Sequence, residues 1–250
     1  MGLVISGGGT LKGSSRTWQS GGMTHRGRRK LAYTPAVMRA RTGFVDRCIA
    51  EIDVALRTLG ETDARSGVAA PHPARGDGPL TASERDHAAR LMRVNHAGEI
   101  AAQALYRGQA LVARDAALRA DLLQAADEEH DHLRWCAERT RALGQEVSRL
   151  SPAWYLGSLA IGAVAGLAGD RVSLGFLAET ERQVCEHLDG HLVQLPAADA
   201  ASRAIVTGMR ADELAHQRRA EDQGGVELPF PIRLGMRAAA RVMTGVARYL

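Results

Sequence analysis

The sequence predicts an all-α protein whose main part is a four-helix bundle. From Thr81 to Leu250, apolar residues recur every three or four positions, which is the helical period, and no alternating strand pattern occurs. The hydrophobic share of 45% and the charged share of 24% are ordinary for a folded protein of 250 residues. The three cysteines lie far apart without a CxxC motif, which excludes a disulfide scaffold and a thiolate zinc site.

Residues 1–43 are expected to form a disordered basic tail, because they are rich in Gly, Ser and Arg and lack a periodic apolar pattern. Residues 1–45 hold eight of the 32 basic residues and none of the 28 acidic ones. The rest of the chain therefore carries 24 basic against 28 acidic side chains, and the formal net charge of +4 belongs to the tail. We expect no nucleic-acid partner, since the predicted bundle lacks a basic surplus.

The remaining elements follow from periodicity and from residues that start or end helices. A short amphipathic helix is predicted at 44–60, followed by a linker at 61–80 that is dense in Gly, Pro and charged residues. Thr81 and Glu84 fit a capping box at the start of the bundle. Four long helices are predicted near 82–114, 116–143, 171–195 and 197–222. The residues that separate or end them are Gly144, Pro152, Pro196 and Gly224-Gly225.

Two apolar segments lie outside this pattern. Leu150–Gly169 has no charged residue and is marginally long enough for a bilayer, which takes about 20 apolar residues. It is interpreted either as an apolar hairpin buried beside the bundle or as an element that dips into a membrane. Residues 230–250 carry Arg233, Arg237 and Arg241 among apolar residues, a pattern that suits either an anionic membrane surface or a helix that covers the bundle.

Glutamate and histidine residues interrupt the otherwise apolar stripes of the four long helices. In chain order they are Glu99 on the first helix, Glu129 and His132 on the second, Glu181 on the third, and Glu213 and His216 on the fourth. The spacing repeats, because each half of the pattern has one lone glutamate followed about 30 residues later by Glu-x-x-His. Two antiparallel helix hairpins would therefore direct four carboxylates and two imidazoles to one point in the core.

A buried cluster of this kind indicates metal binding. An isolated buried carboxylate is unfavourable by several kcal/mol, and four together repel one another. Two divalent cations would balance four carboxylates, and oxygen and imidazole ligands without thiolate favour iron or manganese. This ligand set is that of the ferritin-like di-iron and di-manganese proteins. The predicted fold is thus a ferritin-like four-helix bundle with an added apolar hairpin and a C-terminal amphipathic helix.

Several neighbouring residues remain open in function. Glu128, His130, Asp131 and Asp212 are expected to be solvated or to lie just outside the ligands. His96 is expected to orient a ligand or fill the core, and His187 and His191 to be polar non-ligands. Tyr106 is expected either to lie near the metals or, as the favoured case, to be a core tyrosine.

At these positions the sequence resembles the demethoxyubiquinone hydroxylases of ubiquinone biosynthesis, the Coq7 family. The segments that carry the resemblance are Arg93-Val94-Asn95-His96-Ala97-Gly98-Glu99, Glu129-His130-Asp131-His132-Leu133, Glu181-Arg182-Gln183-Val184-Cys185-Glu186-His187 and Asp212-Glu213-Leu214-Ala215-His216. The likeness extends from about residue 44 to the C-terminus, and the most distinctive string is Asn95–Glu99.

The resemblance implies a di-iron monooxygenase with Glu99, Glu129, His132, Glu181, Glu213 and His216 as iron ligands, Glu129 and Glu213 bridging. It implies O2-dependent hydroxylation of a polyprenylated methoxy-methyl-benzoquinol. It also implies peripheral attachment to a membrane, here the cytoplasmic face of a bacterial cell membrane, and contact with other proteins of ubiquinone biosynthesis. The alternatives are a ferritin-like ferroxidase, peroxidase or manganese catalase without a quinone substrate, and a membrane-bound helical scaffold without metal.

Overall fold

The computed structural model describes residues 43–60, 67–73 and 76–250. Contacts divide the chain into residues 1–40 and residues 41–250, and the described part belongs to the second unit. The predicted basic tail, apart from Gly43, lies outside the described residues, as do residues 61–66 and 74–75 of the predicted linker.

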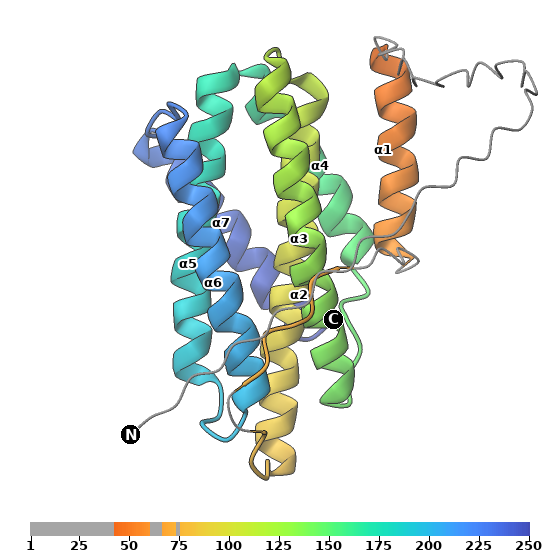
Figure 1. Cartoon of the computed structure of the whole chain (residues 1–250), viewed down its shortest axis with the longest axis vertical. Coiled ribbons are helices and arrows are strands. Elements are labelled where there is room, and N and C mark those ends of the chain that lie inside the picture. Colours follow the sequence, from red (N-terminus) through yellow and green to blue (C-terminus); the bar gives the residue numbers. More distant parts are fainter. Residues whose placement is uncertain (1–42, 61–66, 74–75) are drawn as a thin grey trace, which may run out of the picture. The chain divides into compact units, whose positions relative to one another are not determined.

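The described residues form seven helices and no strand, so the predicted all-α class is confirmed (Figure 1). In chain order the helices are α1 (Phe44–Leu59), α2 (Ala82–Val112), α3 (Ala116–Ala142), α4 (Ser151–Leu167), α5 (Asp170–Gln194), α6 (Ala200–Asp222) and α7 (Phe230–Ala247). The predicted capping box is present, because Thr81 accepts a hydrogen bond from the Glu84 amide and Glu84 accepts one from the Thr81 amide.

Helices α2, α3, α5 and α6 form the four-helix bundle. In Figure 1, α2 and α6 run upward along the chain while α3 and α5 run downward, so α2–α3 and α5–α6 are antiparallel hairpins. Two buried apolar clusters fill the bundle, one around Met92, Leu188 and Met209 and the other around Leu122 and Leu177. Each bundle helix contributes residues to both clusters and has one buried glutamate between them along the chain. These glutamates are Glu99, Glu129, Glu181 and Glu213, so the site occupies the middle of the core.

The apolar segment 150–169 forms one continuous helix, α4, so the prediction of a hairpin is wrong. The glycines of α4 do not break the helix, because they permit its close packing against α2. A Cβ atom at Gly162 would lie 2.1 Å from the carbonyl oxygen of Leu105, and one at Gly108 would lie 2.1 Å from the carbonyl oxygen of Leu159. Among the described residues, no helix is both long enough and apolar enough to span a membrane.

Helix α1 buries two polar side chains against the bundle and leaves several of its apolar side chains exposed. Its buried residues are Glu51 and Thr58. Glu51 forms a two-pronged ion pair with Arg107 of α2 at 2.7 and 3.1 Å, and Thr58 donates a hydrogen bond to Gln103 at 2.9 Å. The sequence predicts this helix correctly but not its orientation, since an amphipathic pattern alone favours burial of the apolar side.

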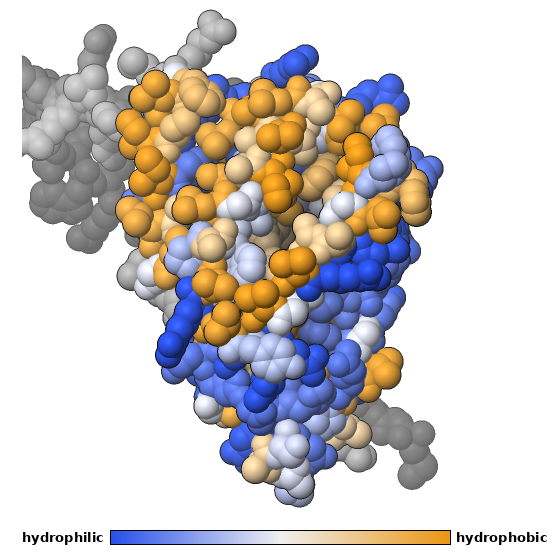
Figure 2. All heavy atoms as spheres, turned by 180° about the vertical axis from the view of Figure 1, so that it is seen from behind, coloured by the Kyte–Doolittle hydropathy of each residue, from blue (hydrophilic) through white to orange (hydrophobic). Residues whose placement is uncertain are grey.

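Apolar side chains of three helices are exposed on one side of the molecule, which we call the apolar face. Its members are Ile49, Ile52 and Leu56 of α1, Leu156, Ile161, Val164 and Leu167 of α4, and Phe230, Ile232, Leu234 and Val242 of α7. Figure 2 shows apolar residues gathered over the half of the molecule that holds these helices, and hydrophilic residues over the other half. Such a large exposed apolar area marks an interaction surface.

Candidate metal centre

The six predicted ligand residues converge in the middle of the bundle, and all of them are at most 5% exposed. They form two groups in which one potential ligand atom per residue lies within 4.8 Å of the others. One group consists of Glu99, Glu129, His132 and Glu213, and the other of Glu129, Glu181, Glu213 and His216. Glu129 and Glu213 belong to both groups, which is the arrangement that two bridging carboxylates require.

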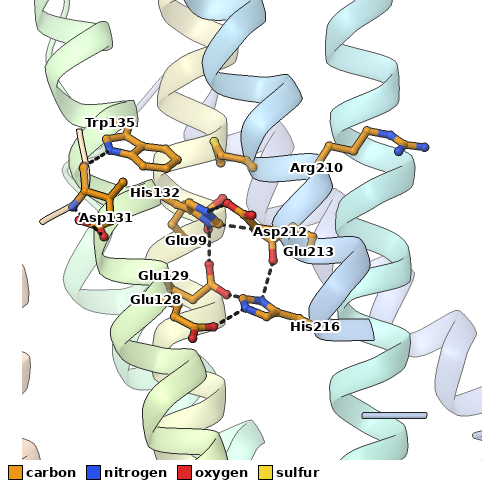
Figure 3. Close-up of polar contacts among 12 residues, drawn as sticks. Glu99, Glu128, Glu129, Asp131, His132, Trp135, Arg210, Asp212, Glu213 and His216 are labelled. Carbon is orange, nitrogen blue, oxygen red and sulfur yellow. Dashed lines mark hydrogen bonds and ion pairs between the residues drawn. The ribbon is translucent and has the colours of Figure 1, made fainter. Parts of the chain in front are cut away.

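Both histidines direct the same ring atom toward this cluster. The Nδ1 atom of His132 lies 3.1 Å from Glu129 and 3.0 Å from Glu213 (Figure 3). The Nδ1 atom of His216 lies 3.3 Å from Glu129 and 3.2 Å from Glu213. The two Glu-x-x-His pairs thus face each other across α3 and α6, and Nδ1 is the atom that each imidazole would offer to a metal ion.

The outer ring atom of each histidine contacts a carboxylate of the opposite helix. The Nε2 atom of His132 lies 3.1 Å from Asp212 of α6, and the Nε2 atom of His216 lies 2.7 Å from Glu128 of α3. A carboxylate in this place fixes the tautomer and orientation of a ligating histidine. From the sequence, both acids could be either solvated or adjacent to the ligands. Each directly precedes a glutamate of the cluster, and this repeated offset is the signal that identifies them.

The electrostatics of the cluster depend on burial and on close charges. Burial, with neighbouring carboxylates, raises the pKa of Glu99 and of Glu181 well above the usual range. Burial also acts to raise the pKa of Glu129, but hydrogen bonds with His132 and His216 outweigh it, so the pKa of Glu129 is lowered. Hydrogen bonds with Glu129 and Glu213, together with the charges of Glu129 and Glu181, outweigh the effect of burial on His216 and raise its pKa to about 12.

The residues fit a pair of divalent cations. Without metal, the raised pKa values keep protons on groups that would have to release them in order to bind a cation. Buried carboxylates are expected to behave in this way when no cation balances their charge. The Oε2 atom of Glu181 is buried and has no hydrogen-bond partner. Two cations would compensate four carboxylates and would give this oxygen atom a partner.

Tyr106 lies at the cluster, which is the less favoured of its two predicted places. It is fully buried, as expected of a core tyrosine, but its hydroxyl donates a hydrogen bond to Oε1 of Glu181. Tyr106 follows Glu99 by seven residues, or about two helical turns, and this spacing on the same face is the available signal. This hydrogen bond helps to hold the Glu181 carboxylate in place.

His96, His187 and His191 lie outside both groups. His96 is buried, and burial lowers its pKa to about 4. His187 and His191 pack against each other with ring centroids 4.0 Å apart. Neither His187 nor His191 belongs to the two groups of potential ligands among the described residues.

A cavity of about 830 Å³ connects the cluster with the apolar face. It lies between α2, α4, α5 and α7, and its wall includes the carboxylate residues Glu99, Glu181 and Glu213. The wall also includes Ile161 of α4 and Ile232 of α7, which are exposed on the apolar face. A long apolar molecule could therefore reach the cluster without crossing the hydrophilic half of the surface.

Comparison with known proteins identifies the family. The sequence model described as "Ubiquinone biosynthesis protein COQ7" matches residues 86–247, more than half of the chain. Proteins named "3-demethoxyubiquinol 3-hydroxylase" from Burkholderia lata and Burkholderia ambifaria are 55% identical over 208 residues and 56% identical over 207 residues. Each match covers 82% of this chain and 99% of the relative. The chain therefore belongs to the COQ7 family of ubiquinone biosynthesis proteins.

Proposed function

We propose that this chain is a 3-demethoxyubiquinol 3-hydroxylase that uses O2 and two iron ions held by Glu99, Glu129, His132, Glu181, Glu213 and His216. The hydroxylase role in ubiquinone biosynthesis follows from the family and from relatives that match over nearly their whole length. One structural observation carries the rest, namely a buried carboxylate–histidine cluster in the wall of an apolar cavity. A polyprenyl benzoquinol has a polar ring and a long apolar tail, which this cavity suits.

The chain contributes binding and positioning rather than a side-chain nucleophile. When bound, the iron ions would supply the O2 activation that ring hydroxylation requires. Glu129 and Glu213 would hold both ions, and Asp212 and Glu128 keep the two histidines oriented. The largely apolar cavity wall would keep water away from the ring. Hydroxylation also needs two electrons and two protons from an external reductant, so that one oxygen atom of O2 enters the ring as hydroxyl and the other leaves as water.

The alternative functions use the same ligands without a quinol. A ferroxidase, peroxidase or manganese catalase acts on small polar substrates and needs no apolar cavity beside its metals. The cavity between α2, α4, α5 and α7 therefore favours the hydroxylase.

We further propose that the chain binds peripherally to the cytoplasmic face of the bacterial cell membrane through the apolar face, where its substrate would enter. The apolar side chains of α1, α4 and α7 support this placement, as does exposed Arg241 of α7, which also lines the cavity and could meet anionic headgroups. Contact with other proteins of ubiquinone biosynthesis remains part of this proposal.

Metal content and quinone profiling test the catalytic proposal. The purified wild type is expected to bind about two iron ions per chain, as two ligand groups share two carboxylates. The Glu129→Ala and Glu213→Ala variants should lose iron and should fail to clear demethoxyubiquinol from a strain that lacks its own hydroxylase. Glu138→Ala removes an exposed glutamate of α3 and should keep both properties. Full iron occupancy in the two cluster variants would refute the assignment of the ligands.

Vesicle binding tests the membrane proposal. The wild type should cosediment with vesicles of phosphatidylcholine and phosphatidylglycerol, and Val242→Asp, on the apolar face, should weaken this binding. Val193→Asp is the matched control, since Val193 is also exposed but lies on α5 outside the apolar face. Equal binding by both variants would show that another surface is responsible.

A further inference from the structure

Asn95 is a buried amide that lacks a proper partner in the ligand-free protein. It is the only asparagine of the chain and is 2% exposed. Among the described residues, its Oδ1 atom has no hydrogen-bond partner, and its Nδ2 atom has only the sulfur of Met92 at 3.8 Å. Leaving a buried amide unpaired is unfavourable, so such a residue in a functional protein requires an explanation.

Another buried amide on the same helix shows how the bundle normally treats this group. Gln103 accepts a hydrogen bond from Thr58 at 2.9 Å and donates one to the carbonyl oxygen of Ala126 at 3.2 Å. Gln103 is therefore satisfied by neighbouring helices. Asn95 instead is one of the residues that line the cavity beside the metal cluster, so a ligand in this cavity would lie next to it.

The position of Asn95 along the bundle places it beside the reacting end of the cavity. It precedes Glu99 by four residues on α2, which is about 6 Å along the helix. His187 and Trp154 also line the cavity, and each has a buried nitrogen atom, Nε2 and Nε1 respectively, without a partner. Because α2 and α5 are antiparallel, Asn95 and His187 are displaced from Glu99 and Glu181 toward the same end of the bundle (Figure 1).

We propose that the carboxamide of Asn95 binds the ring oxygens of the quinol head group and so sets which ring carbon faces the metal cluster. Its Oδ1 atom would accept a hydrogen bond from a ring hydroxyl, and its Nδ2 atom would donate one to an adjacent ring oxygen. This inference rests on the proposed hydroxylase function and adds a substrate-binding residue to it. A carboxamide suits this role because it can donate and accept at neighbouring positions without carrying charge.

A binding role and a packing role predict opposite effects on stability. Asn95→Leu keeps a similar volume and removes the unpaired amide, so the ligand-free variant should unfold at the same temperature as the wild type or higher. The quinol, however, would lose its partner, and KM should rise about 10- to 100-fold. Gln103→Leu makes the same chemical change at a satisfied amide of α2 and should lower the Tm while leaving KM unchanged.

The experiment compares wild type, Asn95→Leu and Gln103→Leu in two measurements. Thermal unfolding of the metal-free proteins gives the Tm, and titration with a short-chain methoxy-methyl-benzoquinol gives binding, independently of turnover. Iron content serves as a check that Asn95→Leu leaves the cluster intact. As a measurement that needs no variant, the wild type should bind the quinol more tightly than its dimethyl ether, which has no ring hydroxyl to donate.

The outcomes separate this inference from the proposed function. If the wild type binds and hydroxylates the quinol while Asn95→Leu binds it equally well, or if Asn95→Leu unfolds at a lower temperature with unchanged KM, Asn95 is a packing residue and the inference is wrong. If the wild type neither binds nor hydroxylates the quinol, the proposed function itself fails. Loss of quinol binding at an unchanged or raised Tm, with iron retained, supports the inference.

Discussion

Asp212 and Glu128 show how single residues outside the ligand set prepare it for metal. Each contacts the Nε2 atom of a histidine on the opposite helix, while Nδ1 of that histidine faces the cluster. A carboxylate that accepts a hydrogen bond from Nε2–H keeps the proton on Nε2 and leaves the Nδ1 lone pair free for a cation. The two contacts are crosswise between α3 and α6, so each helix orients the histidine of the other.

The Asp212→Asn variant tests this orientation. The amide can donate to Nε2, which favours the tautomer with its proton on Nδ1, and we expect metal affinity to fall about 10- to 100-fold. Competition with a chromophoric chelator measures this affinity. Asp189→Asn is the control, because Asp189 is an exposed acid that pairs with Arg210 away from the cluster. Equal affinity in both variants would show that Asp212 does not orient His132.

His96 makes stability depend on pH. Burial lowers its pKa to about 4 from the ordinary value of 6.5, so the unfolded chain takes up a proton between these values and the folded protein does not. The contribution of His96 to the free energy of unfolding is therefore complete above pH 6.5 and falls as the pH decreases toward 4. Urea unfolding at several pH values in the presence of a chelator gives the free energy of unfolding as a function of pH. Between pH 4 and 6.5 this free energy should change less steeply in His96→Leu than in the wild type, by up to about 1.4 kcal/mol per pH unit. Identical slopes would contradict a buried neutral histidine.

At the scale of elements, the helices of the bundle could be predicted from the sequence because their apolar period is regular and their ends carry Gly, Pro or a cap. The convergence of four glutamates and two histidines could be predicted because these residues interrupt apolar stripes at a repeated spacing. The fate of segment 150–169 could not, since glycines that break a helix and glycines that permit close packing look alike in sequence. Only the contact of Gly162 with the α2 backbone distinguishes them.

The orientation of α1 is a second feature beyond the reach of periodicity. Its amphipathic pattern predicts a helix, but the ion pair between Glu51 and Arg107 that turns its polar side inward joins residues 56 positions apart. A similar limit applies to Tyr106, whose hydrogen bond to Glu181 joins α2 to α5 across 75 positions. Pairings at such distances depend on tertiary structure.

Removing the buried acid of α1 should release this helix. Glu51→Ala leaves Arg107 largely buried without its main partner, and loss of one member of a buried pair costs about 3–5 kcal/mol. Limited proteolysis should then cut within α1 faster than in the wild type. Asp53→Ala on the same helix removes a pair with Arg57 whose side chains are both more than half exposed, and should cost no more than about 1 kcal/mol. Equal protection of α1 in both variants would show that other contacts hold it.

At the scale of the whole molecule, metal binding and protonation are linked. The metal-free cluster holds protons on groups with raised pKa values, among them Glu99, Glu181 and His216. A cation must displace these protons, so apparent metal affinity should increase as the pH rises from 6 to 8. Anaerobic calorimetry with Fe²⁺ in two buffers of different ionisation enthalpy measures the proton release. A binding enthalpy independent of the buffer would contradict this linkage.

The sharing of Glu129 and Glu213 between both ligand groups has a consequence for biogenesis. During synthesis the α2–α3 hairpin leaves the ribosome long before α6, and until then it offers only Glu99, Glu129 and His132, an incomplete set for either cation. A nascent chain that ends before Glu213 thus lacks a ligand required in both places. If the proposed iron ions bind here, we therefore expect both of them to enter only after α6 has been synthesised and has packed against α3.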